Sequence, residues 1–129
     1  MRTILIVEDD PVLRNLLEHA LTGRYSLSYA ANGEDAIAAI TSTAPDLILL
    51  DLLLPGGSGF SVLEHVRALP DARKNTPVII VSNLSQESDR HRAEALGATT
   101  YLVKAEVAVD TIIETVERYL PGDTQQKAA

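Results

Sequence analysis

The sequence contains no cysteine among its 129 residues. A disulfide framework and a thiolate metal site are therefore both excluded. Basic residues are also in the minority: 11 Lys and Arg stand against 18 Asp and Glu, which gives a formal net charge of −7. Nucleic acids and anionic membranes are reached through basic surfaces, so we expect neither as a direct partner of this protein.

Long apolar runs are missing as well. No stretch approaches the roughly 20 apolar residues that are needed to span a bilayer. The start of the chain, Met1-Arg2-Thr3, leads directly into a strand-like run and lacks the pattern of a signal peptide. We therefore expect a soluble, cytoplasmic protein. Its length is that of one domain and is sufficient to bury a substantial core.

Strand-like and helix-like patterns alternate five times along the chain. The central strand patterns are almost entirely apolar, which is typical of strands buried on both faces in a parallel sheet covered by helices. This alternation predicts a doubly wound α/β domain. The expected strands cover residues 3–7, 25–30, 46–51, 77–81 and 100–103, and the expected helices cover residues 11–22, 34–41, 60–69, 86–96 and 107–120.

Right-handed crossovers leave few possible orders for these strands. The second strand alternates apolar and polar residues, as a half-exposed edge strand does, so the most economical order is 2-1-3-4-5. We therefore expect a flavodoxin-like, five-stranded parallel sheet with helices on both faces. Residues 1–120 would form the domain, and residues 121–129, which are mostly small and polar, a flexible C-terminal tail.

This strand order places acidic residues opposite one another. Glu8, Asp9 and Asp10 follow the first strand, and Asp51 ends the third. Carboxylates in a partly desolvated crevice repel one another unless one is protonated or a hard cation lies among them, and Mg²⁺ suits such a set. Asp10 precedes Pro11 as an N-cap residue precedes a helix, so we assign Asp10 to capping and leave Glu8 and Asp9 for the metal. On the acids alone, a solvated acidic loop is an equally good interpretation.

Two further strand ends contribute polar side chains. Ser82 follows the fourth strand pattern and Lys104 follows the fifth. A lysine and Mg²⁺ around a phosphoryl group, with a hydroxyl donating to one of its oxygens, recur in phosphoryl transfer. Singly, Ser82 could satisfy backbone groups and Lys104 could be a surface charge, but their combined spacing favours a phosphoryl-transfer site.

These segments resemble the receiver domain of the two-component response-regulator family, over residues 3–120. Each motif is weak alone, but all of them in this order and at these spacings make a strong signal. The motifs are Glu8-Asp9-Asp10 after the first strand, Asp51 followed by Leu54-Pro55-Gly56 and Gly59, Val81-Ser82, Leu96-Gly97-Ala98, and Tyr101-Leu102-Val103-Lys104.

The resemblance implies a phosphoacceptor and a metal site. Asp51 would take a phosphoryl group from a phosphohistidine on a sensor histidine kinase or a histidine phosphotransfer protein. Asp9, Asp51 and the backbone carbonyl of Leu53 would bind Mg²⁺ directly, and Glu8 would act mostly through water. The protein would be a signalling protein, not an enzyme in the usual sense, although it would catalyse its own phosphotransfer and a slow autodephosphorylation.

The resemblance also implies a switch. Lys104 would pair with Asp51 and then with the phosphoryl oxygens, and Ser82 would donate a hydrogen bond to the phosphoryl group. Tyr101 would swing inward once Ser82 has moved, although an aromatic residue in an edge strand is usually only a packing residue. The face built from the fourth helix, the fifth strand and the last helix would report phosphorylation to a downstream protein.

Two residues depart from the family pattern. Ala105 follows Lys104 where the family usually has a proline joined by a cis bond, and Asn83 follows Ser82 where a small residue is usual. A cis peptide before a non-proline residue costs about 2.5–4 kcal/mol. We therefore expect a trans bond between Lys104 and Ala105, with Lys104 still reaching Asp51.

Two alternative functions stay open. A phosphohydrolase of the haloacid dehalogenase type also uses an aspartate nucleophile, a hydroxyl, a lysine and an acid pair on an α/β sheet. Those enzymes carry the nucleophile on the first strand, however, whereas Asp51 ends the third. A receiver-like binding module that signals without phosphorylation would be expected to lack Asp9, Asp51 or Lys104, and all three are present.

Overall fold

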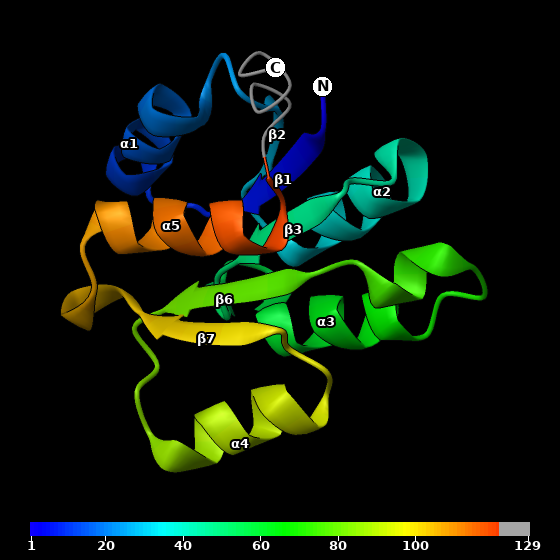
Figure 1. Cartoon of the computed structure of the whole chain (residues 1–129). Coiled ribbons are helices and arrows are strands. Elements are labelled where there is room, and N and C mark those ends of the chain that lie inside the picture. The colour runs from blue at the N-terminus through cyan, green and yellow to red at the C-terminus, as the bar shows by residue number, and fades with distance from the viewer. Residues whose placement is uncertain (122–129) are drawn as a thin grey trace.

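A central parallel sheet carries the fold in the computed structural model, which describes residues 1–121. Its strands lie in the order β2-β1-β3-β6-β7 (Figure 1), which confirms the predicted order 2-1-3-4-5. The strands are β1 (Thr3–Val7), β2 (Ser26–Ala30), β3 (Leu47–Leu50), β6 (Val78–Ser82) and β7 (Thr100–Val103). The helices are α1 (Pro11–Leu21), α2 (Gly33–Thr43), α3 (Gly59–Arg67), α4 (Glu87–Ala95) and α5 (Val109–Tyr119).

The sheet separates two apolar cores. Successive side chains of a strand point to opposite faces, so each central strand contributes to both cores. On β1, Leu5 and Val7 pack with α2, α3 and α4, whereas Ile4 and Ile6 pack with α1 and α5. None of these four side chains is more than 1% exposed. This two-sided burial explains why the central strands are apolar along their whole length.

Several short elements were not predicted from the sequence. Directly after Asp51, β4 (Leu53–Leu54) and β5 (Gly57–Ser58) pair as an antiparallel hairpin. Two 3₁₀ turns, η1 (Ala72–Asn75) and η2 (Lys104–Glu106), lie in the segments before β6 and after β7. Elements of two to four residues are too short to show a hydrophobic period, so only the folded chain reveals them.

Helix caps fix the direction of the chain on both sides of the sheet edge. Oδ1 of Asp10 accepts a hydrogen bond from the backbone N–H of Val12 at 3.0 Å, and Pro11 is the first residue of α1. The assignment of Asp10 to capping is therefore confirmed. In the same way Ser58 caps α3 by accepting from the N–H of Phe60 at 3.1 Å.

Two expectations concern the membrane and the end of the chain. Within residues 1–121, no helix has the length and apolar character that crossing a membrane requires. The flexible tail expected at residues 121–129 lies, apart from Pro121, outside the described residues.

Substitution of Gly59 tests how closely α3 packs against the segment that carries Asp51. A Cβ added at Gly59 would lie 2.3 Å from the carbonyl oxygen of Asp51 and 2.7 Å from Cα of Leu52. Both are backbone atoms, which can yield only if the chain moves. We expect Gly59→Ala to lower the free energy of unfolding by about 1–3 kcal/mol, the usual cost of overpacking, as measured by urea denaturation.

Gly33 offers a matched control, because it is also the first residue of a helix. A Cβ there would meet only Cγ2 of Val62, at an ordinary contact distance of 3.7 Å. Gly33→Ala should therefore leave the free energy of unfolding unchanged or raise it slightly. Equal losses of stability in the two variants would show that the contact with Asp51 is not the cause.

Candidate functional site

Four polar side chains meet at the carboxyl edge of the sheet. Glu8 follows β1, Asp51 follows β3, Ser82 ends β6 and Lys104 follows β7, so each side chain is positioned by a different parallel strand. Glu8 and Asp51 are 3% and 4% exposed, and Ser82 is fully buried. The topology thus brings together residues that are up to 96 positions apart in the sequence.

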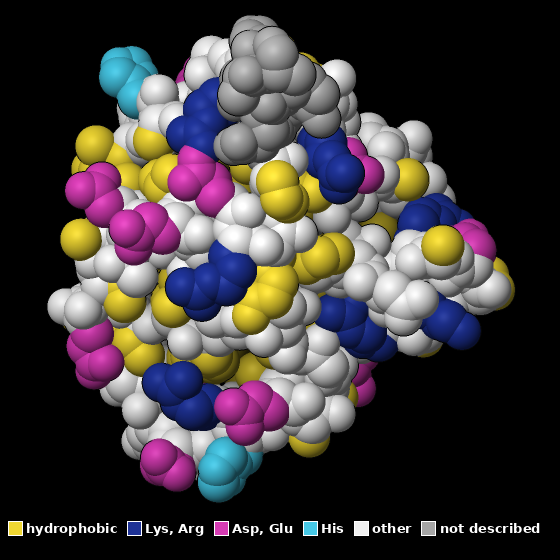
Figure 2. All heavy atoms as spheres, in the orientation of Figure 1, with side chains coloured by type: hydrophobic (Ala, Val, Ile, Leu, Met, Phe, Trp, Pro, Cys, Tyr) yellow, Lys and Arg dark blue, Asp and Glu magenta, His cyan; other side chains and the backbone are white. Residues whose placement is uncertain are grey.

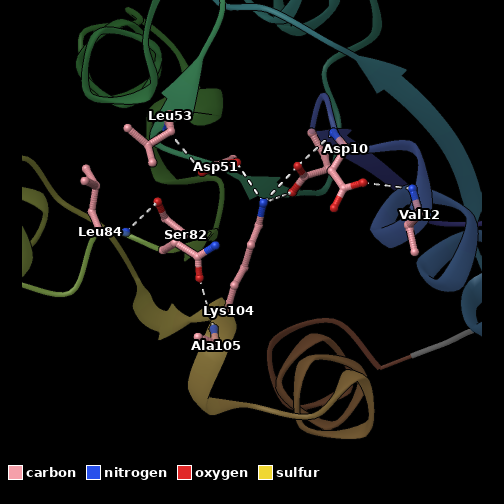
Figure 3. Close-up of polar contacts among 10 residues, drawn as sticks. Asp10, Val12, Asp51, Leu53, Ser82, Leu84, Lys104 and Ala105 are labelled. Atoms are coloured by element: carbon pink, nitrogen blue, oxygen red, sulfur yellow. Dashed lines mark hydrogen bonds and ion pairs between the residues drawn. The ribbon is translucent and has the colours of Figure 1, made fainter.

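The Lys104 ammonium joins two of the acids. Its Nζ donates hydrogen bonds to Oε2 of Glu8 and Oδ2 of Asp51, both at 2.9 Å, and Figure 3 shows the side chain extended toward Asp51. No cis peptide bond occurs in residues 1–121, so the bond between Lys104 and Ala105 is trans, as expected. The lysine therefore reaches Asp51 without the cis bond that is usual in the family.

Burial and charge shift the pKa values of Glu8 and Lys104. Burial raises the pKa of the Glu8 carboxyl, and its hydrogen bonds from Lys104 and from the Asp10 amide offset only part of that effect. Burial also works to lower the pKa of the Lys104 ammonium. Its hydrogen bonds to Glu8 and Asp51 outweigh this effect, so the pKa of Lys104 lies above its ordinary value. Lys104 therefore stays charged, whereas ionisation of the Glu8 carboxyl carries a desolvation cost.

Three carboxylates could hold a cation. Glu8, Asp9 and Asp51 each offer one oxygen, and these oxygens lie within 4.8 Å of one another. Glu8 and Asp51 are buried and Asp9 is exposed, so the set is open to water on one side, as Mg²⁺ sites commonly are. Three ionised carboxylates and one ammonium leave an excess of two negative charges, which a divalent cation would balance. The donor set therefore fits Mg²⁺.

Leu53 lies two residues beyond Asp51, in β4. Its backbone N–H donates to Oδ1 of Asp51 at 3.0 Å, and its side chain is 52% exposed. This hydrogen bond and the one from Lys104 engage different oxygens of Asp51, so together they orient the carboxylate. That the Leu53 carbonyl is a metal ligand stays a prediction.

The hydroxyl of Ser82 is linked to the predicted switch residue. Oγ of Ser82 accepts from the backbone N–H of Leu84 at 3.3 Å, and the carbonyl of Leu84 accepts from the Tyr101 hydroxyl at 2.6 Å. Tyr101 is only 7% exposed, and the guanidinium of Arg90 lies 4.9 Å from the centre of its ring. Tyr101 therefore points inward in this structure, and its movement together with Ser82 stays a prediction.

Asn83 also lies at this edge, and no role was predicted for it from the sequence. Its Oδ1 accepts a hydrogen bond from the backbone N–H of Ala105 at 3.1 Å. The available signal was that both residues depart from the family pattern, directly after the predicted hydroxyl and the predicted lysine. Which departures touch each other depends on the register between β6 and β7, and that register was not predicted.

Comparison with known protein sequences identifies relatives over nearly the whole described chain. A family model for the response regulator receiver domain matches residues 4–117. Sporulation initiation phosphotransferase F of Bacillus subtilis is 34% identical over 119 residues, which are 92% of this chain and 93% of that protein. Gliding motility regulatory protein of Myxococcus xanthus is 35% identical over 117 residues, 89% of this chain but only 15% of that protein. The chain thus spans the length of some relatives and a small part of others.

Solved structures of related proteins have a similar fold. Chemotaxis protein CheY4 of Vibrio cholerae is 28% identical, with a TM-score of 0.82 and coverage of 93% of this chain and 99% of that one. The receiver domain of sensor histidine kinase PA1611 of Pseudomonas aeruginosa was solved with a magnesium ion coordinated in its active site cleft. It is 27% identical, with a TM-score of 0.79, and the match covers 92% of this chain and 96% of that one.

The raised pKa of Glu8 generates a prediction about stability and pH. A carboxyl whose pKa is raised on folding favours the folded state below its ordinary pKa of 4.5, and this contribution is lost as the pH rises through the raised value. We therefore expect Glu8→Gln to be more stable than the wild type at pH 7 without divalent cations, and the difference to shrink toward zero below pH 4.5. Urea denaturation across this pH range measures it. A Glu8→Gln variant that is less stable than the wild type at neutral pH would show that the pair with Lys104 outweighs burial.

Proposed function

Because the chain belongs to the receiver-domain family of two-component response regulators, we propose that Asp51 accepts a phosphoryl group from a phosphohistidine on a sensor histidine kinase or a histidine phosphotransfer protein. One observation carries the proposal: the Lys104 ammonium lies 2.9 Å from Oδ2 of Asp51, at an edge where Glu8 and Ser82 also converge. A carboxylate with an adjacent fixed cation and a nearby hydroxyl has the groups that phosphoryl transfer requires.

The reaction forms one bond and breaks another. An oxygen of Asp51 attacks phosphorus, the bond from phosphorus to the imidazole nitrogen of the donor breaks, and the imidazole leaves with the electron pair and takes up a proton. The product is an acyl phosphate. Lys104 offsets the charge on the transferring oxygens, and the Leu53 amide keeps the carboxylate oriented. The Ser82 oxygen already accepts from Leu84, so its proton is available to a phosphoryl oxygen.

The metal in this proposal is Mg²⁺. Asp9, Asp51 and the carbonyl of Leu53 would hold it directly, and Glu8 would act mostly through water. When bound, the ion neutralises charge that develops on the phosphoryl oxygens. Support comes from the three carboxylate oxygens within 4.8 Å of one another and from the related receiver domain that holds magnesium in its cleft.

The output face would be built from α4, β7 and α5. Of the residues in α4 only Ala93 is buried, so this helix has few anchors and belongs to the segments that open at low free energy. Figure 2 shows apolar, acidic and basic side chains intermixed over this side of the molecule, a surface suited to a protein partner. Phosphorylation brings roughly two negative charges to Asp51, and the Ser82–Leu84–Tyr101 contacts connect that site to α4 through Arg90.

The two alternative functions are less well supported. The match to the receiver family over residues 4–117 disfavours a phosphohydrolase of the haloacid dehalogenase type. A binding module that works without phosphorylation would not need Lys104 to be held between Glu8 and Asp51, yet that contact is formed. The cytoplasm, where such donor kinases present their phosphohistidine, is the proposed location.

The proposed Mg²⁺ site predicts different effects of substitution at the neighbouring residues Asp9 and Asp10. Asp9→Asn should abolish Mg²⁺-dependent labelling by a small phosphodonor such as acetyl phosphate. It should leave the free energy of unfolding unchanged or higher, because it relieves carboxylate repulsion. Asp10→Asn is the matched control: Asn caps helices as well as Asp does, so labelling should persist. Labelling of the wild type in excess chelator would contradict the metal requirement.

The residues around the site also predict the lifetime of the phosphoryl group. Hydrolysis needs a water in line with the acyl phosphate, and a polar side chain can orient it. The positions two residues beyond Asp51 and two beyond Ser82 are Leu53 and Leu84, which cannot. We expect slow autodephosphorylation, accelerated at least severalfold by Leu53→Asn or Leu84→Gln and unchanged by Leu84→Met. Loss of radiolabel from the isolated chain measures this, and a wild-type half-life of seconds would show the reasoning wrong.

A further inference from the structure

The ends of β6 and β7 leave the sheet side by side. Ser82 and Val103 are register partners, so the residues that follow them, Asn83 and Lys104, are neighbours at the edge. After Val103 the chain enters the turn η2, whose N-cap residue contributes no side-chain hydrogen bond. The first amides of a helical turn have no acceptor within it. The amide of Ala105 is one of these donors.

Asn83 supplies the acceptor from the neighbouring strand end. Its Oδ1 lies 3.1 Å from the amide nitrogen of Ala105, the contact drawn to Ala105 in Figure 3. A proline at position 105 would have no N–H to donate, and a small apolar residue at position 83 would have no oxygen to accept. The two departures from the family pattern are therefore complementary, since the donor present in one meets the acceptor present in the other.

We propose that Asn83 is a positioning residue for Lys104. The Lys104 side chain has four rotatable bonds, and its ammonium is useful only where it reaches Glu8 and Asp51 together. The hydrogen bond to the Ala105 amide fixes the backbone from which the Lys104 side chain extends. Fewer conformations are then open to this side chain, so a larger fraction of them places its ammonium beside Glu8 and Asp51. This inference rests on the proposed role of Asp51 as phosphoacceptor.

The same hydrogen bond ties two functional loops together. Residues 82–84 are held by Ser82 to Leu84 and by Leu84 to Tyr101, and Asn83 adds the link to the loop that carries Lys104. The Ser82 hydroxyl and the Lys104 ammonium would contact the proposed phosphoryl group on Asp51, and this link keeps their separation fixed. Removing the link should slow phosphorylation without unfolding the domain, because Asn83 and Ala105 are both exposed.

The test compares Asn83→Leu, which keeps the size but removes the acceptor, with Asn83→Asp, which keeps an acceptor oxygen. The control is Asn75→Leu, at an exposed position whose side chain makes no hydrogen bond within residues 1–121. One readout is amide hydrogen exchange of Ala105 by NMR without metal. We expect exchange at least tenfold faster in Asn83→Leu, near wild type in Asn83→Asp and unchanged in Asn75→Leu. Unchanged exchange in Asn83→Leu would overturn the inference.

The second readout is the rate constant of Mg²⁺-dependent labelling by acetyl phosphate at saturating Mg²⁺. We expect a three- to thirtyfold decrease in Asn83→Leu, with the midpoint of urea denaturation nearly unchanged. In an Ala105→Pro background, which lacks the donor, Asn83→Leu should cause no further decrease. An equal decrease in both backgrounds would overturn the positioning role. If the wild type is not labelled at all, the proposed function fails and the positioning role with it. If the wild type is labelled but Asn83→Leu does not slow it, only the positioning role fails.

Discussion

The pairing of the Lys104 ammonium with Glu8 and Asp51 is the interaction on which the site depends. Each of these charges would be costly to bury alone, and together they satisfy one another. The sheet order sets the distance that the Lys104 side chain must span to reach Asp51, because β6 separates β3 from β7. Two strand spacings amount to about 10 Å, so a long side chain is required to reach from one strand end to the other. In doing so it passes the end of β6, where Ser82 lies.

A chain of contacts connects this edge of the sheet to α4. The lysine contact, the Ser82 hydroxyl and the Leu84 carbonyl lie on adjoining strand ends, and Tyr101 connects the last of them to Arg90 on α4. In the proposed function, a phosphoryl group on Asp51 would first change the partner of Lys104, which contacts Asp51 directly. The remaining contacts are single hydrogen bonds or a cation–π contact, each worth roughly 1 kcal/mol, so they can rearrange without disturbing the two cores.

The sequence was sufficient to predict the strand order, the strand-end position of each polar group and the trans bond after Lys104. Those features follow from hydrophobic periodicity, from the shared direction of parallel strands and from the intrinsic preference of a peptide bond. The β4–β5 hairpin, the η2 turn and the contact of Asn83 with Ala105 did not follow. They depend on register and on side chains from separate segments, for which a single sequence contains no local signal. The start of the last helix was placed at residue 107 and lies at Val109, because η2 occupies the preceding residues.

Four polar side chains of the site, those of Glu8, Asp51, Ser82 and Lys104, come from the carboxyl ends of strands. Val12 and Leu16 on α1 are 66% and 49% exposed and pack into neither core. These exposed apolar residues therefore lie on a part of the chain that is separate from the polar strand ends. Substitutions on these exposed helix faces leave the contacts among Glu8, Asp51 and Lys104 unchanged. The surface of the protein can therefore vary independently of the edge at which the proposed phosphoryl transfer takes place.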